Sequence, residues 1–186
     1  MSGVRGELLT LLRVRSLRRG DFVLASGQRS SYYIDCRLTT MSGQGQRLIG
    51  ELGLALLDEH QWRPQLIGGL TLGADPVAFA LAHCATLAGR TLDAFTVRKD
   101  VKAHGTGRLI EGAEVADRDV VVVEDVITTG GSALRAIAAV VEAGARVLGV
   151  FAVVDRGEGG RERLEAEGWR VLGLTTAEEL LAEVSR

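Results

Sequence analysis

Cysteine, proline and aromatic residues are scarce in this chain of 186 residues, which has two cysteines, two prolines, two tryptophans, two tyrosines and four phenylalanines. Cys36 and Cys84 are too few for a disulfide framework, and nothing near them resembles a metal-ligand pair. We therefore expect two reduced, buried thiols and a cytoplasmic protein. Two prolines also exclude a proline-rich linker.

Excess charge and long apolar runs are missing as well. The formal net charge of −2 argues against nucleic acid or an anionic membrane surface as the main partner. The N-terminus has no signal-like pattern, and no apolar run is long enough to span a bilayer. The length fits one domain. We therefore expect a single globular unit whose partners are small molecules.

The most informative stretch is Val120–Ser132. Four consecutive valines predict a central parallel strand that is covered on both faces. Glu124 and Asp125 follow at its expected carboxyl end, where open α/β sheets bind ligands. Thr128–Ser132 can then direct backbone N–H groups and hydroxyls toward one point at the start of the next helix, which makes an anion site. Carboxylates that accept hydrogen bonds from hydroxyls, next to a binding site for a phosphate, suit a sugar phosphate.

Two other nucleotide-binding motifs are excluded. Valines followed by acids are also found in P-loop NTPases, but no Gly-x-x-x-x-Gly-Lys-Ser/Thr occurs in the chain. Gly105-Thr106-Gly107 begins like a dinucleotide fingerprint, but Ile110 occupies the position of the third glycine. Apolar strands that end in Asp before a Gly-Gly turn also occur without this function, so Val120–Ser132 alone leaves the question open.

Hydrophobic periodicity predicts a layered α/β domain with a parallel sheet. The N-terminal segment 3–16 is predicted as an amphipathic helix, and residues 22–35 as a hairpin that turns at Gly27. Ser42 is the expected N-cap of a long helix, and Asp75 the cap of a helix that begins near Pro76. Predicted strands at 65–70, 92–97, 120–123, 146–154 and 171–174 alternate with helices at 42–60, 77–88, 132–143, 160–167 and 177–184.

A basic stretch, Arg98–Arg108, lacks apolar periodicity and ends near two glycines. It is expected to be an exposed loop that leaves the same sheet edge as the Glu124–Ser132 segment. A run of charges is usually solvated surface, but this one has the correct sign for a highly anionic ligand. Asp155 and Arg156 follow another predicted strand, where an ordinary surface charge and a binding role are equally good interpretations of Arg156.

Taken together, these stretches resemble the motifs of type I phosphoribosyltransferases, and of orotate phosphoribosyltransferases in particular. Val122–Ser132 resembles the phosphoribosyl-diphosphate (PRPP) motif, and Phe22–Asp35 resembles the N-terminal hood. Gly68–Pro76 resembles one form of the pyrophosphate loop, and Arg98–Gly107 resembles the catalytic loop. The resemblance implies a Rossmann-like α/β fold, with a central parallel sheet flanked by helices. It divides a single domain, 1–186, into an N-terminal helix and hood to about residue 40 and a core from about residue 62.

The implied reaction joins orotate to the ribosyl 5-phosphate group of PRPP, giving orotidine 5′-monophosphate and pyrophosphate in pyrimidine biosynthesis. The implied catalytic residues are Lys102, Asp125 and His104. The implied PRPP contacts are Arg98, Lys99, Lys102 and His104 on the pyrophosphate, Glu124 and Asp125 on the ribose hydroxyls, and Val126, Ile127, Thr128, Thr129, Gly130, Gly131 and Ser132 around the 5′-phosphate. The implied orotate contacts are Thr128, Arg156, Tyr33 and Ile34. The guanidinium of Arg156 suits bidentate binding of the orotate carboxylate.

Mg²⁺ is expected to arrive with PRPP, so no dedicated metal ligands are assigned. The resemblance also implies a homodimer in which loop 98–108 serves the neighbouring subunit's site. Two departures stand out, because Ala25 and Gly73 occupy positions where many members carry lysine. Two alternatives remain: a phosphoribosyltransferase for a purine or uracil, which the hood and Arg156 disfavour, and a PRPP-sensing regulator that binds nucleic acid, which the charge and length disfavour.

Overall fold

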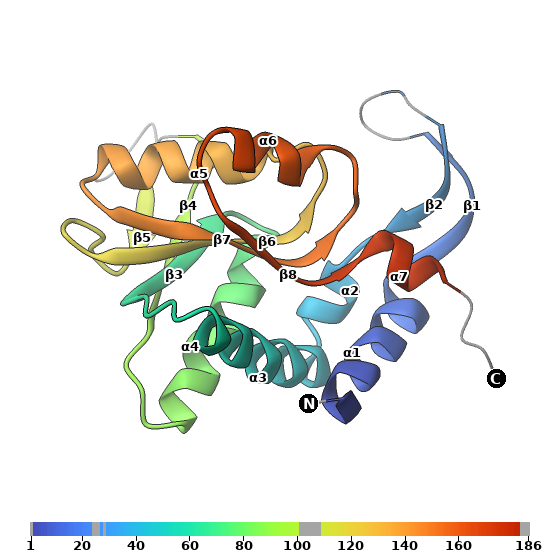
Figure 1. The fold of residues 1–186 in the computed structure, drawn as a ribbon, viewed down its shortest axis with the longest axis horizontal. Coiled ribbons are helices and arrows are strands. Elements are labelled where there is room, and N and C mark those ends of the chain that lie inside the picture. The colour runs from blue at the N-terminus through green and yellow to red at the C-terminus, as the bar shows by residue number, and fades with distance from the viewer. Residues whose placement is uncertain (1, 24–26, 28, 101–108, 183–186) are drawn as a thin grey trace.

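The computed structural model describes residues 2–23, 27, 29–100 and 109–182. Its main feature is a six-stranded sheet with helices on both faces, beside a two-stranded hairpin (Figure 1). The elements in chain order are α1 (Ser2–Arg15), β1 (Leu17–Val23), β2 (Arg29–Ile34), α2 (Arg37–Thr40), α3 (Gly43–Glu59), β3 (Leu66–Leu70), α4 (Ala74–Leu87), β4 (Asp93–Val97), β5 (Ile110–Gly112), β6 (Asp119–Ile127), α5 (Gly131–Glu142), β7 (Arg146–Asp155), α6 (Gly160–Ala166), β8 (Val171–Thr176) and α7 (Ala177–Leu181).

The sheet order is β5-β4-β3-β6-β7-β8. Every neighbouring pair is parallel except β4 and β5, so the predicted parallel sheet is correct apart from one antiparallel edge strand. From β3 the chain builds outward to β4 on one side and, after β5, to β6 on the other. This reversal makes the gap between β3 and β6 the topological switch point, where open α/β sheets bind their ligands.

The four valines of β6 alternate between two hydrophobic cores. Val121 and Val123 belong to the core with α1, α3 and α4, whereas Val120 and Val122 belong to the core with α5 and α6. All four are fully buried, which confirms the prediction of a strand covered on both faces. Figure 1 shows α5 and α6 on one face of the sheet and α3 and α4 on the other.

The C-terminal helix α7 holds both the N-terminal helix α1, through Arg13, and the hairpin, through Arg19. Arg13 Nε donates to the carbonyl of Leu180 at 3.1 Å, and Arg19 Nη2 donates to the carbonyl of Leu181 at 2.8 Å. These bonds satisfy carbonyls near the end of α7 that have no partner within the helix. The hairpin begins earlier than predicted, because β1 starts at Leu17, within the segment that the prediction left between the helix 3–16 and the hairpin 22–35.

Several boundaries correct the sequence-based expectations. β6 continues to Ile127, so the acid pair lies within the strand and not after it. α4 begins at Ala74 with Gly73 as N-cap and no side-chain capping bond, so the prediction of Asp75 as the cap is wrong. Ser42 does cap α3, accepting a bond from the amide of Gly45 at 3.1 Å.

The two thiols differ in exposure. Cys36 is buried as expected, but Cys84 is only half-buried, and both are free. Burial, together with the nearby carboxylates of Asp125 and Asp35, raises the pKa of Cys36 well above its usual value, so this thiol stays protonated. None of the helices in the described part of the chain combines the length and apolar character needed to cross a membrane.

Candidate active site

Most of the predicted site residues line one cleft of about 360 Å³ at the switch point, which we call the site cleft. It opens between the hairpin, the turn after β3 and the carboxyl half of β6. Among described residues its charged lining comprises four cations and three acids, although the whole chain is net acidic. The lining residues are Tyr33, Ile34, Asp35, Cys36, Arg37, Leu70, Thr71, Leu72, Gly73, Lys99, Glu124, Asp125, Val126, Thr128, Ser132, Arg135 and Arg156.

Glu124 is a buried acid with an unused oxygen. Its residue is 7% exposed, and Oε1 has no hydrogen-bond partner among the described residues. Burial and, to a smaller extent, the charge of Asp125 raise the pKa of Glu124 to about 8, although the charge of Arg135 opposes the shift. A buried carboxyl oxygen without a hydrogen bond costs free energy. A ligand hydroxyl that donates to this oxygen would remove that cost, so Glu124 suits a hydroxyl donor.

Asp125 lies beside Glu124 and against the turn after β3. Burial raises its pKa, while a bond from the amide of Val126 at 3.0 Å and the positive charge of Arg37 act in the opposite direction. Arg37 itself forms a two-pronged ion pair with Asp35, with distances of 2.8 and 3.1 Å. On the other side Gly73 approaches so closely that an added Cβ would lie 2.4 Å from Asp125 Oδ1. The absence of a side chain at residue 73 therefore leaves the space that the Asp125 carboxylate occupies.

A smaller cavity of about 40 Å³ adjoins the site cleft at the start of α5. It is lined by Glu124, Val126, Ile127, Thr128, Thr129, Gly130, Gly131, Ser132 and Ala133, which include all seven residues predicted to surround a phosphate. Gly130 has a φ of +73°, a left-handed conformation that favours glycine. The turn brings the free N–H groups of the helix start to this cavity, which suits an anion.

Arg156 follows β7 and forms the far wall of the site cleft. Its side chain is 6% exposed, Nη2 lies 2.9 Å from Glu158 Oε1, and Nε has no hydrogen-bond partner in the described chain. The guanidinium also lies 5.1 Å from the ring centroid of Tyr32. A buried cation with unused donors is suited to a planar carboxylate, and the tyrosine ring below it favours one orientation of the guanidinium plane.

The basic loop is only partly described. Lys99 lines the site cleft, but Arg98 is not among its lining residues and instead points to β5, where Nη1 lies 3.6 Å from Glu111 Oε1. Lys102 and His104 lie outside the described residues. Of the two predicted pyrophosphate contacts that the structure describes, it therefore brings Lys99, and not Arg98, into the cleft.

Sequence reasoning missed four charged or aromatic residues at this site. Asp35 is the last residue of the hood motif and Arg37 lies two positions beyond it, and Arg135 follows Ser132 by three positions, so it lies on the same helix face. Tyr32 was passed over in favour of Tyr33, which is 38% exposed and packs on Phe22 with ring centroids 5.7 Å apart. The hairpin register, which a sequence does not fix, decides which tyrosine lies below Arg156.

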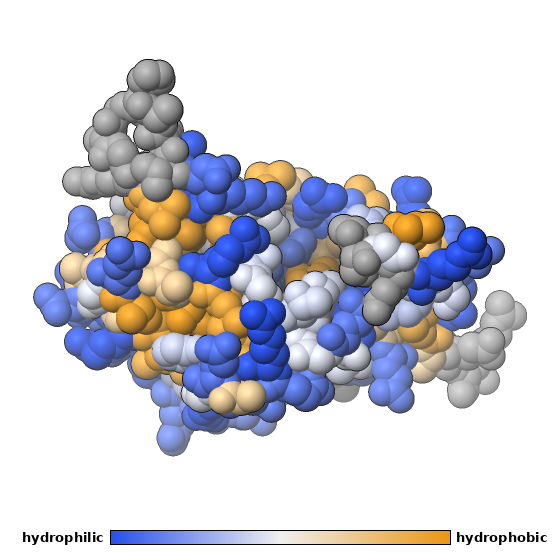
Figure 2. Space-filling view, turned by 90° about the horizontal axis from the view of Figure 1, so that it is seen from above, coloured by the Kyte–Doolittle hydropathy of each residue, from blue (hydrophilic) through white to orange (hydrophobic). Residues whose placement is uncertain are grey.

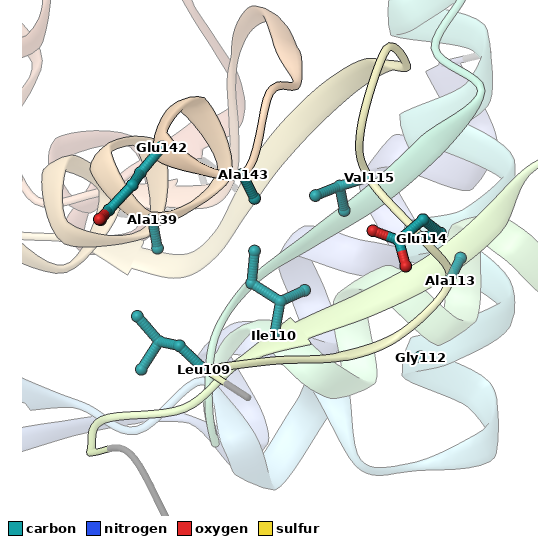
Figure 3. A pocket seen from close by; sticks show the side chains of 9 residues that line it. All are labelled: Leu109, Ile110, Gly112, Ala113, Glu114, Val115, Ala139, Glu142 and Ala143. Atoms are coloured by element: carbon teal, nitrogen blue, oxygen red, sulfur yellow. The ribbon is translucent and has the colours of Figure 1, made fainter. Parts of the chain in front are cut away.

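Another cavity, of about 340 Å³, lies between β5 and α5. In Figure 3 the side chains of Ile110, Val115 and Ala143 approach one another across it. Its two charged lining residues, Glu114 and Glu142, are both acidic, so it does not suit a phosphate. Figure 2 shows a hydrophobic area on the face that carries α5, in keeping with this apolar lining.

Comparisons with known proteins agree with this geometry. Residues 66–172 match the family model described as a phosphoribosyl transferase domain. A protein named orotate phosphoribosyltransferase from Mycobacterium tuberculosis is 50% identical over 173 residues, or 91% of this chain and 94% of its own length. Another of that name, from Streptomyces avermitilis, is 48% identical over 89% of this chain and 90% of its own length.

A solved structure extends the similarity to the fold. The crystal structure of the M. tuberculosis enzyme in complex with PRPP has a TM-score of 0.82 and 44% identity, and the match covers 95% of this chain and 98% of that one. Similarity in sequence and in fold along nearly the whole of both chains establishes common membership. The chain therefore belongs to the orotate phosphoribosyltransferase family, a group of pentosyltransferases with the type I phosphoribosyltransferase fold.

Proposed function

We propose that the site cleft binds PRPP across the switch point and orotate against the hairpin, and so carries out the reaction of the family. This reaction transfers the ribosyl 5-phosphate group to orotate and yields orotidine 5′-monophosphate and pyrophosphate. The observation that carries the assignment is the direct succession, along one strand and turn, of a buried acid, a half-buried acid and an anion site. Few ligands other than a phosphorylated pentose need all three.

The ribose and its 5′-phosphate are assigned to β6 and the turn that follows. Glu124 and Asp125 accept bonds from the 2′- and 3′-hydroxyls, which completes the unused oxygen of Glu124. The negative charge of Asp125, and that of Glu124 when it is ionised, stabilises the positive charge that builds on the ribose ring as its C1–O bond breaks. The turn 126–132 holds the phosphate with backbone N–H groups and hydroxyls.

Orotate is assigned to the wall that Arg156 and the hairpin form. Arg156 binds the carboxylate of the base, Tyr33 and Ile34 cover the ring, and Thr128 offers a hydroxyl. A carboxylate is the feature that separates orotate from uracil and from purines. A buried guanidinium with unused donors gains most from that group, because a base without a carboxylate leaves its Nε donor unused.

The pyrophosphate is assigned to Lys99 and, on the same loop, to Arg98, Lys102 and His104. These cations absorb the negative charge that grows on the leaving group, and we assign Lys102 the main catalytic role. Among the described residues no three His, Cys, Asp or Glu side chains form a metal-binding group. Carboxylate oxygens of Glu124 and Asp125 that the ribose hydroxyls leave free would help to hold Mg²⁺ bound to PRPP, and such an ion would supply further charge neutralisation at the leaving group.

We further propose a cytoplasmic homodimer that forms a single domain per chain and binds neither nucleic acid nor membrane. The site cleft adjoins an exposed apolar surface that includes Leu38, Met41 and Leu72, with exposed fractions of 44%, 49% and 54%. A second copy that covers this surface would bring its loop 98–108 close to the first copy's cleft. Sharing of that loop is tested by mixing Lys102→Ala with Asp125→Asn protomers.

Complementation distinguishes shared loops from self-contained sites. If the loop acts in the neighbouring site, mixed dimers contain one complete site, and the mixture regains about a quarter of wild-type activity. No recovery would refute the sharing.

The reaction is tested by following orotate consumption with Mg²⁺ and PRPP, using uracil and hypoxanthine as control bases. Turnover of a control base in preference to orotate would identify another phosphoribosyltransferase. Salt-dependent DNA binding without turnover would identify a regulator.

A further inference from the structure

We propose that Asp75 is a positioning residue that fixes the turn Thr71–Gly73 for pyrophosphate binding by tying it to the end of β4. This inference rests on the proposed function, because it concerns the leaving-group side of the same cleft. Asp75 does not line the site cleft, so it acts through the turn and not on the ligand.

The first observation is that both oxygens of Asp75 are used. Thr71 Oγ1 donates to Oδ2 at 2.6 Å, and Thr96 Oγ1 donates to Oδ1 at 2.9 Å. Thr71 belongs to the turn after β3, whereas Thr96 lies on β4, two residues before the basic loop begins at Arg98. One carboxylate thus joins the ends of two neighbouring strands.

The second observation concerns what the turn can offer a ligand. Thr71, Leu72 and Gly73 carry no charge, so the turn and the start of α4 contribute backbone N–H groups. A flexible cation can reach for a misplaced phosphate, but a backbone donor points wherever the turn puts it. The amide of Thr71 is already bonded to the carbonyl of Val97 at 2.8 Å, so the turn is attached to β4 at the backbone as well.

The third observation is the sign of the charge. Asp75 places a carboxylate behind a turn that should attract a highly anionic ligand, and it makes no capping bond to the helix. A residue kept only for electrostatics here would be neutral or cationic. Its position in the first turn of α4 reduces the repulsion, because the positive end of the helix dipole lies there. Some repulsion between Asp75 and the anionic ligand remains. We infer that correct alignment of the turn's backbone N–H groups offsets it.

The test compares Asp75→Ala, Asp75→Asn and the control Thr86→Val, which removes a threonine hydroxyl elsewhere on α4. Calorimetry measures binding of pyrophosphate with Mg²⁺ and, separately, of orotidine 5′-monophosphate, which leaves the pyrophosphate position empty. We expect Asp75→Ala to weaken pyrophosphate binding about 10- to 100-fold, since a misaligned contact commonly costs that much. Binding of the nucleotide should stay within about twofold, and the ratio of KM for PRPP to KM for orotate should rise in parallel.

Asp75→Asn removes the charge but can still bond both hydroxyls, so it should remain within about threefold of wild type. Tighter pyrophosphate binding by both variants would show that the charge, and not the alignment, matters, and would overturn the proposal. Equal weakening of both ligands would indicate a general structural role and would also overturn it. If Asp75→Ala does not fold, Thr71→Val and Thr96→Val remove the two bonds one at a time and replace it in the same comparison. Failure of the wild type to consume orotate would instead refute the proposed function.

Discussion

The close approach of Gly73 to Asp125 yields the sharpest prediction. In Gly73→Ala the new Cβ would lie 2.4 Å from Asp125 Oδ1, whereas ordinary contacts begin at 3.4 Å, so the carboxylate must move by about 1 Å. Displacement of a positioned group by that distance costs on the order of 100-fold in rate. The backbone at Gly73 is right-handed helical, a conformation that alanine adopts freely, so the fold should tolerate the change.

The assay is steady-state kcat/KM for PRPP together with thermal unfolding. We expect kcat/KM to fall about 100-fold, while Tm shifts by only a few degrees, because the clash meets the end of a side chain and not the backbone. Gly6→Ala is the matched control: nothing lies within 4 Å of its added Cβ, and it should gain about 1 kcal/mol of helix stability without loss of activity. A Gly73→Ala enzyme within threefold of wild type would refute the reasoning. Gly73→Lys should fail in the same way, because its Cβ meets the same carboxylate oxygen.

Three further predictions follow from the site. Lys102→Ala should lose about 100- to 1000-fold in turnover, the effect of removing one charged contact worth ~3–4 kcal/mol in the transition state, with unfolding unchanged; turnover within a few-fold of wild type would exclude its role. Glu124 has a pKa raised from 4.5 to about 8, so the folded state holds its proton more tightly than the unfolded state, and stability falls as pH rises between these values. Glu124→Gln should therefore become more stable than wild type across that interval, by a few kcal/mol at most, and a difference that does not vary with pH in denaturant titrations would contradict this. Tyr32→Leu should raise KM for orotate about 2- to 30-fold through loss of ~0.5–2 kcal/mol of cation–π contact, whereas KM for PRPP and the Tyr32→Phe variant should stay near wild type; equal effects on both substrates would point to a displaced hairpin.

The order of strands and helices in the core could be predicted from the sequence because periodicity and burial agree there. The valines of β6 are apolar on both faces, and the structure gives each face its own core. The acid pair was assigned to the end of this strand because polar residues ordinarily end a buried strand. In the structure β6 pairs with β3 only as far as Val122 but with β7 as far as Ile127, so one neighbour extends the strand beyond its apolar part. Such pairing is a property of the assembled sheet, which local sequence does not encode.

The same distinction explains the site residues that were missed. Glu124 and Thr128 belong to a contiguous motif, so local signals suffice to find them. Asp75 was interpreted as a cap because Asp before Pro is a common helix start, yet its partners Thr71 and Thr96 come from two different strand ends. Arg37 and Tyr32 matter only because the hairpin folds over the sheet. Contacts between distant segments are set by tertiary packing, and a single sequence gives little access to them.

The hydrogen bond between Arg13 of α1 and Leu180 of α7 has a consequence for synthesis of the chain. Its two ends are 167 residues apart in sequence, which corresponds to roughly 8–33 s of translation. During that interval the hairpin that carries Tyr32 has emerged from the ribosome without the helix that fastens it. The last strand of the central sheet, β8, ends at Thr176 and α7 begins at the next residue, so the sheet and the helix that fastens the hairpin are completed almost together, at the end of synthesis.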